Sequence, residues 1–141
     1  VVEYEKYPFL NDLIPDDVTA IGGLTVGADP VAYGIAAVAA TRGRSLKSFP
    51  SRKEAKGHGI AGRLAGPPEP GDKCINTDDT VTRGTSPMEA VHVARELGAE
   101  PVMVMVVVDR GGTCQAMAEA EGIAFRALVT APELGFPYEG A

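Results

Sequence analysis

Two adjacent carboxylates, Asp78 and Asp79, stand immediately before a turn rich in hydroxyl groups. The residues of that turn are Thr80, Val81, Thr82, Arg83, Gly84, Thr85 and Ser86. A helix is predicted directly after them, and exposed backbone N–H groups at a helix N-terminus bind phosphate well. Because carboxylates accept hydrogen bonds from vicinal hydroxyls, the combination predicts a site for a sugar phosphate. A solvated turn before a capped helix is the alternative explanation.

A cluster of positive charge lies in residues 52–59, which read Arg-Lys-Glu-Ala-Lys-Gly-His-Gly. Arg52, Lys53 and Lys56 carry fixed charges, and His58 adds one when it is protonated. Glycines flank the histidine, so the loop has the freedom to close over a polyanion. Preorganised positive charge of this kind stabilises a departing pyrophosphate. The alternative is a solvated charge run on an exposed loop.

Two further turns carry weaker signals. Residues 22–27, Gly-Gly-Leu-Thr-Val-Gly, match the glycine spacing of a Walker A loop, but Ala28-Asp29 replace the required lysine and hydroxyl residue. A P-loop nucleoside triphosphatase is therefore excluded, while a backbone anion site remains open. Arg110 follows the most apolar stretch of the chain, where its guanidinium can bind a planar carboxylate through two N–H groups or pair internally with Asp109.

The elements that must position these residues alternate between short apolar runs and helical stretches. This order predicts βαβ units in one domain, 1–141, with an open, mostly parallel sheet flanked by helices. We expect strands at 18–21, 45–49, 73–77, 102–108 and 124–129, and helices at 29–40, 86–98 and 113–121. Ligands of such sheets bind beyond the carboxyl ends of the strands, so the turns above should converge there.

Three features support these boundaries. Residues 102–108 are seven consecutive apolar residues without alternation, which predicts a strand buried on both faces. Asp29 before Pro30 is typical of a helix N-cap, and Ser86 with Glu89 fits a capping box. Residues 51–70 lack apolar periodicity and hold several glycines and prolines, so we expect a long exposed loop.

Composition excludes several classes of protein. A formal net charge of −6 argues against a general nucleic-acid surface, which needs a basic footprint. No apolar run approaches the roughly 20 residues that span a bilayer, and the N-terminal residues have no secretory pattern. Cys74 and Cys114 lack metal-ligand spacing, so we expect reduced thiols in a cytoplasmic protein, with a disulfide or metal pair as the alternative.

Together these segments resemble the orotate phosphoribosyltransferase branch of the type I phosphoribosyltransferases. Residues 52–59 are similar to its mobile catalytic loop, with Gly57 where an aspartate is frequent. Residues 78–86 resemble its signature for 5-phosphoribosyl-1-pyrophosphate (PRPP), two acids followed by a Thr-x-Gly-Thr turn. Residues 22–31 resemble its pyrophosphate loop and the next helix, and residues 108–110 its orotate-binding strand end. The resemblance covers 18–134 in one consistent order.

The resemblance implies how PRPP is bound. Asp78 and Asp79 would bind the ribose hydroxyls, and residues 82–86 the 5-phosphate. Leu24 and Thr25 would belong to the pyrophosphate loop. The residues expected to act on the pyrophosphate are Arg52, Lys53, Lys56 and His58, and Lys56 is the leading catalytic candidate, ahead of Lys53 and His58.

The resemblance also implies the other ligands. Thr82 and Arg110 would contact orotate, or another small base. Mg²⁺ would enter with PRPP, so no metal site of the protein's own is expected. The family works as a homodimer in which the mobile loop reaches the partner's active site.

Two departures keep alternatives open. About seventeen residues precede the first predicted strand, and none match the family's orotate-contacting N-terminal segment. This favours a PRPP-binding regulatory or degenerate paralogue without transferase activity, whereas the intact Lys53, Lys56 and His58 favour the enzyme. Transfer to another base is a third alternative. Asn76 and Thr77 stand where the family is mostly aliphatic. Since an unpaired buried polar group costs about 1–3 kcal/mol, we expect Asn76 to have a specific partner or its strand to be only partly buried.

Overall fold

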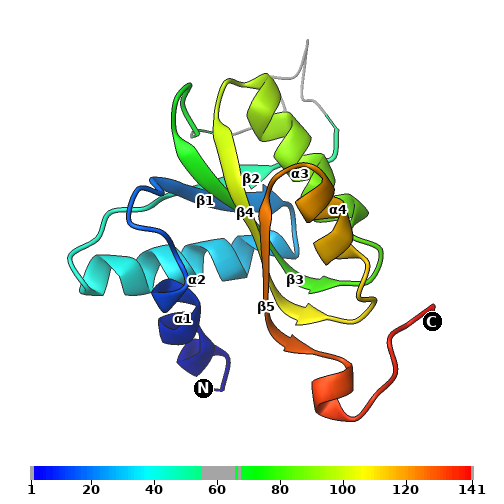
Figure 1. Ribbon diagram of the computed structural model, residues 1–141. Coiled ribbons are helices and arrows are strands. Elements are labelled where there is room, and N and C mark those ends of the chain that lie inside the picture. The colour runs from blue at the N-terminus through cyan, green and yellow to red at the C-terminus, as the bar shows by residue number, and fades with distance from the viewer. Residues whose placement is uncertain (1, 55–65, 67, 141) are drawn as a thin grey trace.

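A single sheet of five parallel strands forms the centre of the molecule (Figure 1). The computed structural model describes residues 2–54, 66 and 68–140, without the side chains of residues 2–6. The strands are β1 (Ala20–Leu24), β2 (Lys47–Ser51), β3 (Lys73–Val81), β4 (Glu100–Asp109) and β5 (Ala124–Thr130). They lie in the order β2-β1-β3-β4-β5, and every neighbouring pair is parallel. The predicted fold class is confirmed.

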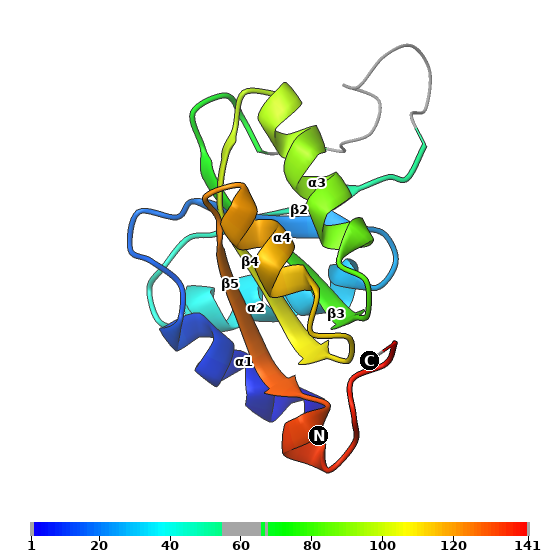
Figure 2. The same cartoon turned by 45° about the vertical axis from the view of Figure 1, so that its right-hand side comes forward.

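Helices cover both faces of this sheet (Figures 1 and 2). They are α1 (Val2–Asp12), α2 (Ala28–Thr41), α3 (Thr85–Glu96) and α4 (Cys114–Ala120), and a short 3-10 helix follows at Pro132–Leu134. The core divides accordingly into clusters on the two sides of β4. Met103 and Met105 pack with the α1 and α2 side, whereas Val104 and Val106 pack with α3 and α4. This accounts for the unbroken apolar run in β4.

The helix starts differ from the predicted ones. The N-cap of α2 is Gly27, and Asp29 lies inside the first turn, so the predicted Asp29 cap is wrong. The N-cap of α3 is Gly84, with φ of 80°, and Ser86 lies inside the helix. The predicted capping box, with Ser86 as the N-cap, is therefore wrong, because glycine has no side chain that could cap the helix. In both cases a glycine is the N-cap, and the helix begins at an earlier residue than the predicted side-chain cap implies.

The central strand β3 is longer and more buried than predicted. It continues through the acid pair to Val81, with Asp78 opposite Val106 and Thr80 opposite Val108 of β4. Asn76 is fully buried, and neither its amide oxygen nor its nitrogen has a hydrogen-bond partner among the residues described. The expectation of a partner or of partial exposure is therefore wrong, and β3 keeps an unsatisfied polar group in the core.

Both cysteines are free and fully buried in separate parts of the core. Cys74 packs in one cluster with Phe49 and Ala94, whereas Cys114, the first residue of α4, belongs to the cluster that contains Met88 and Val91 of α3. Burial raises the pKa of each thiol to about 12, so the reactive thiolate is scarce at neutral pH. In the part of the chain that the structure describes, no helix is both long and apolar enough to cross a bilayer.

Candidate functional site

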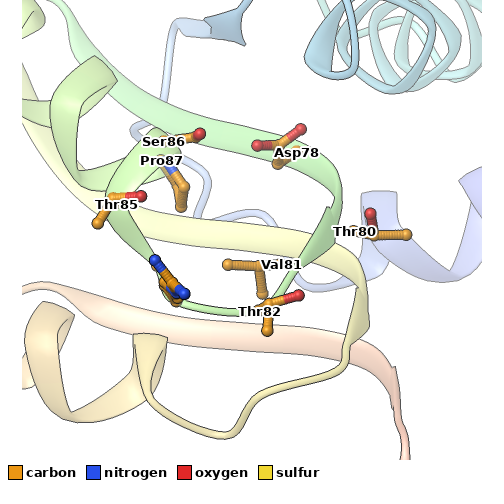
Figure 3. A pocket seen from close by; sticks show the side chains of 9 residues that line it. Asp78, Thr80, Val81, Thr82, Thr85, Ser86 and Pro87 are labelled. Carbon is orange, nitrogen blue, oxygen red and sulfur yellow. The ribbon is translucent and has the colours of Figure 1, made fainter. Parts of the chain in front are cut away.

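The carboxyl end of β3 and the N-terminus of α3 enclose a hollow of about 260 Å³, here called the first hollow (Figure 3). Its lining consists of Asp78, Thr80, Val81, Thr82, Arg83, Gly84, Thr85, Ser86 and Pro87. Hydroxyl groups and the first backbone N–H groups of α3 therefore share one concave surface. A helix start of this kind is suited to an anion.

The turn that forms the first hollow is held by glycines. Gly84 adopts φ of 80°, and a Cβ there would lie 2.9 Å from the Cα of Cys114, so a larger residue would be both strained and crowded. A Cβ on Gly111 would lie 1.7 Å from the carbonyl oxygen of Thr82. The same carbonyl accepts a hydrogen bond of 3.0 Å from the Thr113 hydroxyl. The turn after β3 is thus pressed against the turn after β4.

The acid pair borders a second hollow of about 180 Å³, on the side facing the turn after β1. Its lining consists of Leu24, Thr25, Val26, Gly27, Lys53, Asp78, Asp79, Thr80 and Ser86. Asp78, Thr80 and Ser86 line both hollows, so the two are adjacent. A Cβ on Gly27 would lie 2.8 Å from an oxygen of each carboxylate, which makes the β1–α2 turn the second wall of the acid site.

The two carboxylates differ in their surroundings. Asp78 is 9% exposed, whereas Asp79 is exposed, and the Asp79 N–H donates to Asp78 Oδ1 at 3.0 Å. Burial raises the pKa of Asp78 to about 7, and the neighbouring Asp79 carboxyl adds to this rise. The Asp79 N–H and the charge of Lys53 act in the opposite direction. The site therefore carries an excess of negative charge that a cation or hydroxyl donors would relieve.

The structure brings several of the predicted PRPP residues together. The acid pair and the turn 80–86 form one surface, and Leu24 and Thr25 face the acid pair across the second hollow. Lys53 lines that hollow with them, and Arg52 precedes it directly after β2. The Thr25 N–H donates to the Ser51 carbonyl at 2.8 Å, which holds the two strand ends together. The predictions for Lys56 and His58 fall outside the described residues.

Arg110 and Thr82 also come together, because both side chains contact Glu139, a residue that was not predicted to belong to the site. The Arg110 guanidinium pairs with the Glu139 carboxylate, and the Thr82 hydroxyl donates to that carboxylate at 3.4 Å. The predicted alternative, pairing with Asp109, is wrong. Asp109 instead accepts hydrogen bonds from the N–H groups of Gly111 and Gly112, at 3.1 and 2.9 Å. No local pattern around Glu139 marks it, because its role arises from a contact 29 residues away.

Next to Arg110 lies a third hollow of about 380 Å³. Its lining is mainly apolar and consists of Val108, Arg110, Ala131, Leu134, Phe136, Pro137 and Glu139. A flat ring with one anionic substituent suits such a surface, since the walls are apolar and one guanidinium stands at the edge. Within the described residues, no group of three or more His, Cys, Asp and Glu side chains is arranged to hold a metal ion.

Comparison with known proteins gives consistent results. No protein-family model matches this sequence. The chain is 44% identical over 128 residues to an orotate phosphoribosyltransferase of Streptomyces avermitilis, covering 89% of this chain and 70% of that protein. It is 44% identical over 119 residues to one of Corynebacterium glutamicum, covering 84% of this chain and 63% of that protein. The chain thus spans 63 to 70% of the length of these relatives.

Solved structures resemble the chain over nearly its whole length. A phosphoribosyltransferase from Corynebacterium diphtheriae superposes with a TM-score of 0.82 at 41% identity, covering 95% of this chain and 77% of that one. An orotate phosphoribosyltransferase of Mycobacterium tuberculosis in complex with PRPP superposes with a TM-score of 0.80 at 34% identity, covering 94% of this chain and 75% of that one.

Proposed function

Because the chain belongs to the orotate phosphoribosyltransferase family, we propose that it transfers the phosphoribosyl group of PRPP to orotate, which gives orotidine 5′-phosphate and pyrophosphate. One observation carries the proposal at the level of geometry: the buried Asp78 of the acid pair lines two adjacent hollows, one at a helix N-terminus and one beside a lysine. A sugar that is phosphorylated at both ends needs this order of groups.

In the proposed complex the 5-phosphate occupies the first hollow, where the N–H groups at the start of α3 and the hydroxyls of residues 82–86 surround it. The ribose hydroxyls donate to Asp78 and Asp79. The pyrophosphate occupies the second hollow, between the turn at Leu24 and Thr25 and the charge of Lys53. Arg52, Lys56 and His58 are assigned to the same pyrophosphate by the family resemblance, with Lys56 as the leading catalytic candidate.

The transfer breaks the bond between the anomeric carbon and the pyrophosphate oxygen and forms a bond from that carbon to a ring nitrogen of orotate, whose proton passes to the departing pyrophosphate. Positive charge develops on the sugar, and negative charge on the leaving group. In the proposed complex Asp78 and Asp79 stabilise the positive charge on the sugar and Lys53 stabilises the leaving group, a proposal supported by the hollow that all three residues line. Positioning and charge neutralisation therefore account for the chemistry without a strong protein base.

Mg²⁺ enters this proposal as a companion of PRPP. Carboxylate oxygens are the ligands that Mg²⁺ prefers, and the Asp78 and Asp79 carboxylates both border the hollow proposed for the pyrophosphate, so the residues present fit the ion. Asp78 and Asp79 would hold it near the ribose, where it would neutralise the diphosphate. The family resemblance further supports a cytoplasmic homodimer, which sedimentation of the purified protein would test.

The direct test follows the PRPP-dependent loss of orotate absorbance in the presence of Mg²⁺, beside a calorimetric titration with PRPP. Turnover supports the proposal, and binding of PRPP without turnover would assign the chain to PRPP-binding proteins that do not transfer. Consumption of another base but not orotate would change the substrate.

A pair of variants tests the site itself. Lys53→Ala should slow turnover at least tenfold, because it removes the charge beside the leaving group. Lys73→Ala removes the same charge at the opposite end of β3, where Lys73 pairs with Asp17 on the surface, and should leave turnover unchanged. Equal effects of the two variants would contradict the assignment of Lys53.

A further inference from the structure

The Glu139 carboxylate is paired with Arg110, the cation that the proposed reaction needs to bind the carboxylate of the base. It pairs with the guanidinium of Arg110, and its second oxygen accepts from the Thr82 hydroxyl. Thr82 and Arg110 are the two residues assigned to orotate. A carboxylate of the chain itself therefore stands where the carboxylate of the substrate would be expected.

Glu139 also stands between two hollows. It lines the third hollow, with its apolar walls, and a fourth hollow of about 380 Å³ whose other lining residues are Thr82, Arg83, Thr113 and Gly140. Arg83 thus lines the same fourth hollow as Glu139, so a second cation borders the space beside the Glu139 carboxylate.

The segment that carries Glu139 is held by its backbone and by a ring. The Glu139 N–H donates to the Arg110 carbonyl at 2.8 Å, and the Tyr138 ring packs so closely on Gly112 that a Cβ there would lie 2.8 Å from it. The side chains of Arg110 and Glu139 are 46% and 49% exposed. The anchor is thus separate from the ion pair, and a half-exposed pair is weak enough for a ligand to displace.

We propose that Glu139 is a built-in competitor for the carboxylate of the base, and that it lowers the affinity of the site for acidic bases. The inference rests on the proposed function, because it takes Arg110 as the group that binds the carboxylate. A base without a carboxylate does not compete for the guanidinium, so its affinity is independent of Glu139. Glu139 therefore sets how strongly the site distinguishes an acidic ring from a neutral one.

The test compares two nucleotides that differ only in the carboxylate, orotidine 5′-phosphate and uridine 5′-phosphate. Both bring a phosphate to the first hollow, so calorimetric titration measures both. In Glu139→Gln we expect orotidine 5′-phosphate to bind two- to five-fold more tightly, the range that displacing an exposed ion pair allows, and uridine 5′-phosphate to bind as before. Glu119→Gln removes the same charge from the exposed surface of α4 and should change neither.

Each outcome decides the matter. Unchanged or weaker binding of orotidine 5′-phosphate by Glu139→Gln would overturn the inference, and so would an equal gain for both nucleotides, which would indicate a general charge effect. Failure of the proposed function looks different: neither the unsubstituted protein nor Glu139→Gln would then prefer orotidine 5′-phosphate over uridine 5′-phosphate. A preference without any response to Glu139→Gln would leave the proposed function standing and remove only the inference.

Discussion

Replacing Asp78 by asparagine should stabilise the protein, and the gain should depend on pH. Burial and the neighbouring Asp79 raise the pKa of Asp78 from 3.8 to about 7. Between these two values the folded protein keeps a proton that the unfolded chain releases. Stability is therefore lost as the pH rises from about 4 to about 7, and the loss is complete above pH 7.

The size of the effect follows from the same values. At about 1.4 kcal/mol for each pH unit, the interval from 3.8 to about 7 corresponds to roughly 4 kcal/mol of lost stability, as an upper limit. Asparagine has no charge to bury, and its amide oxygen can still accept the hydrogen bond that the Asp79 N–H now donates at 3.0 Å. We expect Asp78→Asn to gain about 2–4 kcal/mol at pH 8 and almost nothing at pH 4.

Urea unfolding at a series of pH values from 4 to 8 measures this difference. Asp16→Asn serves as the control, because Asp16 is exposed and its replacement changes the net charge equally. The control should stay within about 0.5 kcal/mol of the parent protein at every pH. A gain for Asp78→Asn that is the same at pH 4 and pH 8, or no gain at all, would refute the reasoning. Calorimetry should show that the stabilised variant binds PRPP more weakly, since it loses a carboxylate that we propose binds the ribose.

Two further substitutions test other parts of the site. Gly27→Ala places a Cβ 2.8 Å from an oxygen of each acid, so calorimetry should show at least a tenfold loss of PRPP affinity. Urea unfolding should show a stability change below about 1 kcal/mol, because only the ends of side chains must move. Unchanged PRPP affinity would contradict the placement of the acids. Asn76→Val removes an unpaired buried amide and should raise the free energy of unfolding in urea by about 1–2 kcal/mol, whereas a loss of stability would mean that the amide is hydrogen-bonded.

The sequence predicts a strand most clearly where an unbroken apolar run is buried on both faces of the sheet. The run in β4 is an example, since it packs on both faces. Helix starts were harder, because Gly27 and Gly84 open α2 and α3 without any side-chain cap. The helix α1 has no counterpart among the predicted elements, and Pro8 within it interrupts the pattern by which a helix is recognised.

The site shows the same division. The acid pair and its turn could be predicted as one site, because two acids followed by small and hydroxyl residues before a helix form a local sequence pattern. The partner of Arg110 was not predictable, because Glu139 reaches it through the tertiary fold and stands in a segment without a motif. The identification of the family from the four segments is confirmed by the relatives, whereas the roles of single residues remain predictions.

The contact between Gly111 and the Thr82 carbonyl has a consequence for how two substrates meet. Because no side chain separates these two stretches of backbone, the turn proposed to bind the phosphate and the turn that carries Arg110 are in direct contact. If one turn moves when it binds its ligand, the movement of the other turn is therefore restricted. We expect the first substrate to bind while both turns can still move, and the second substrate to bind after the turns have been fixed by the first.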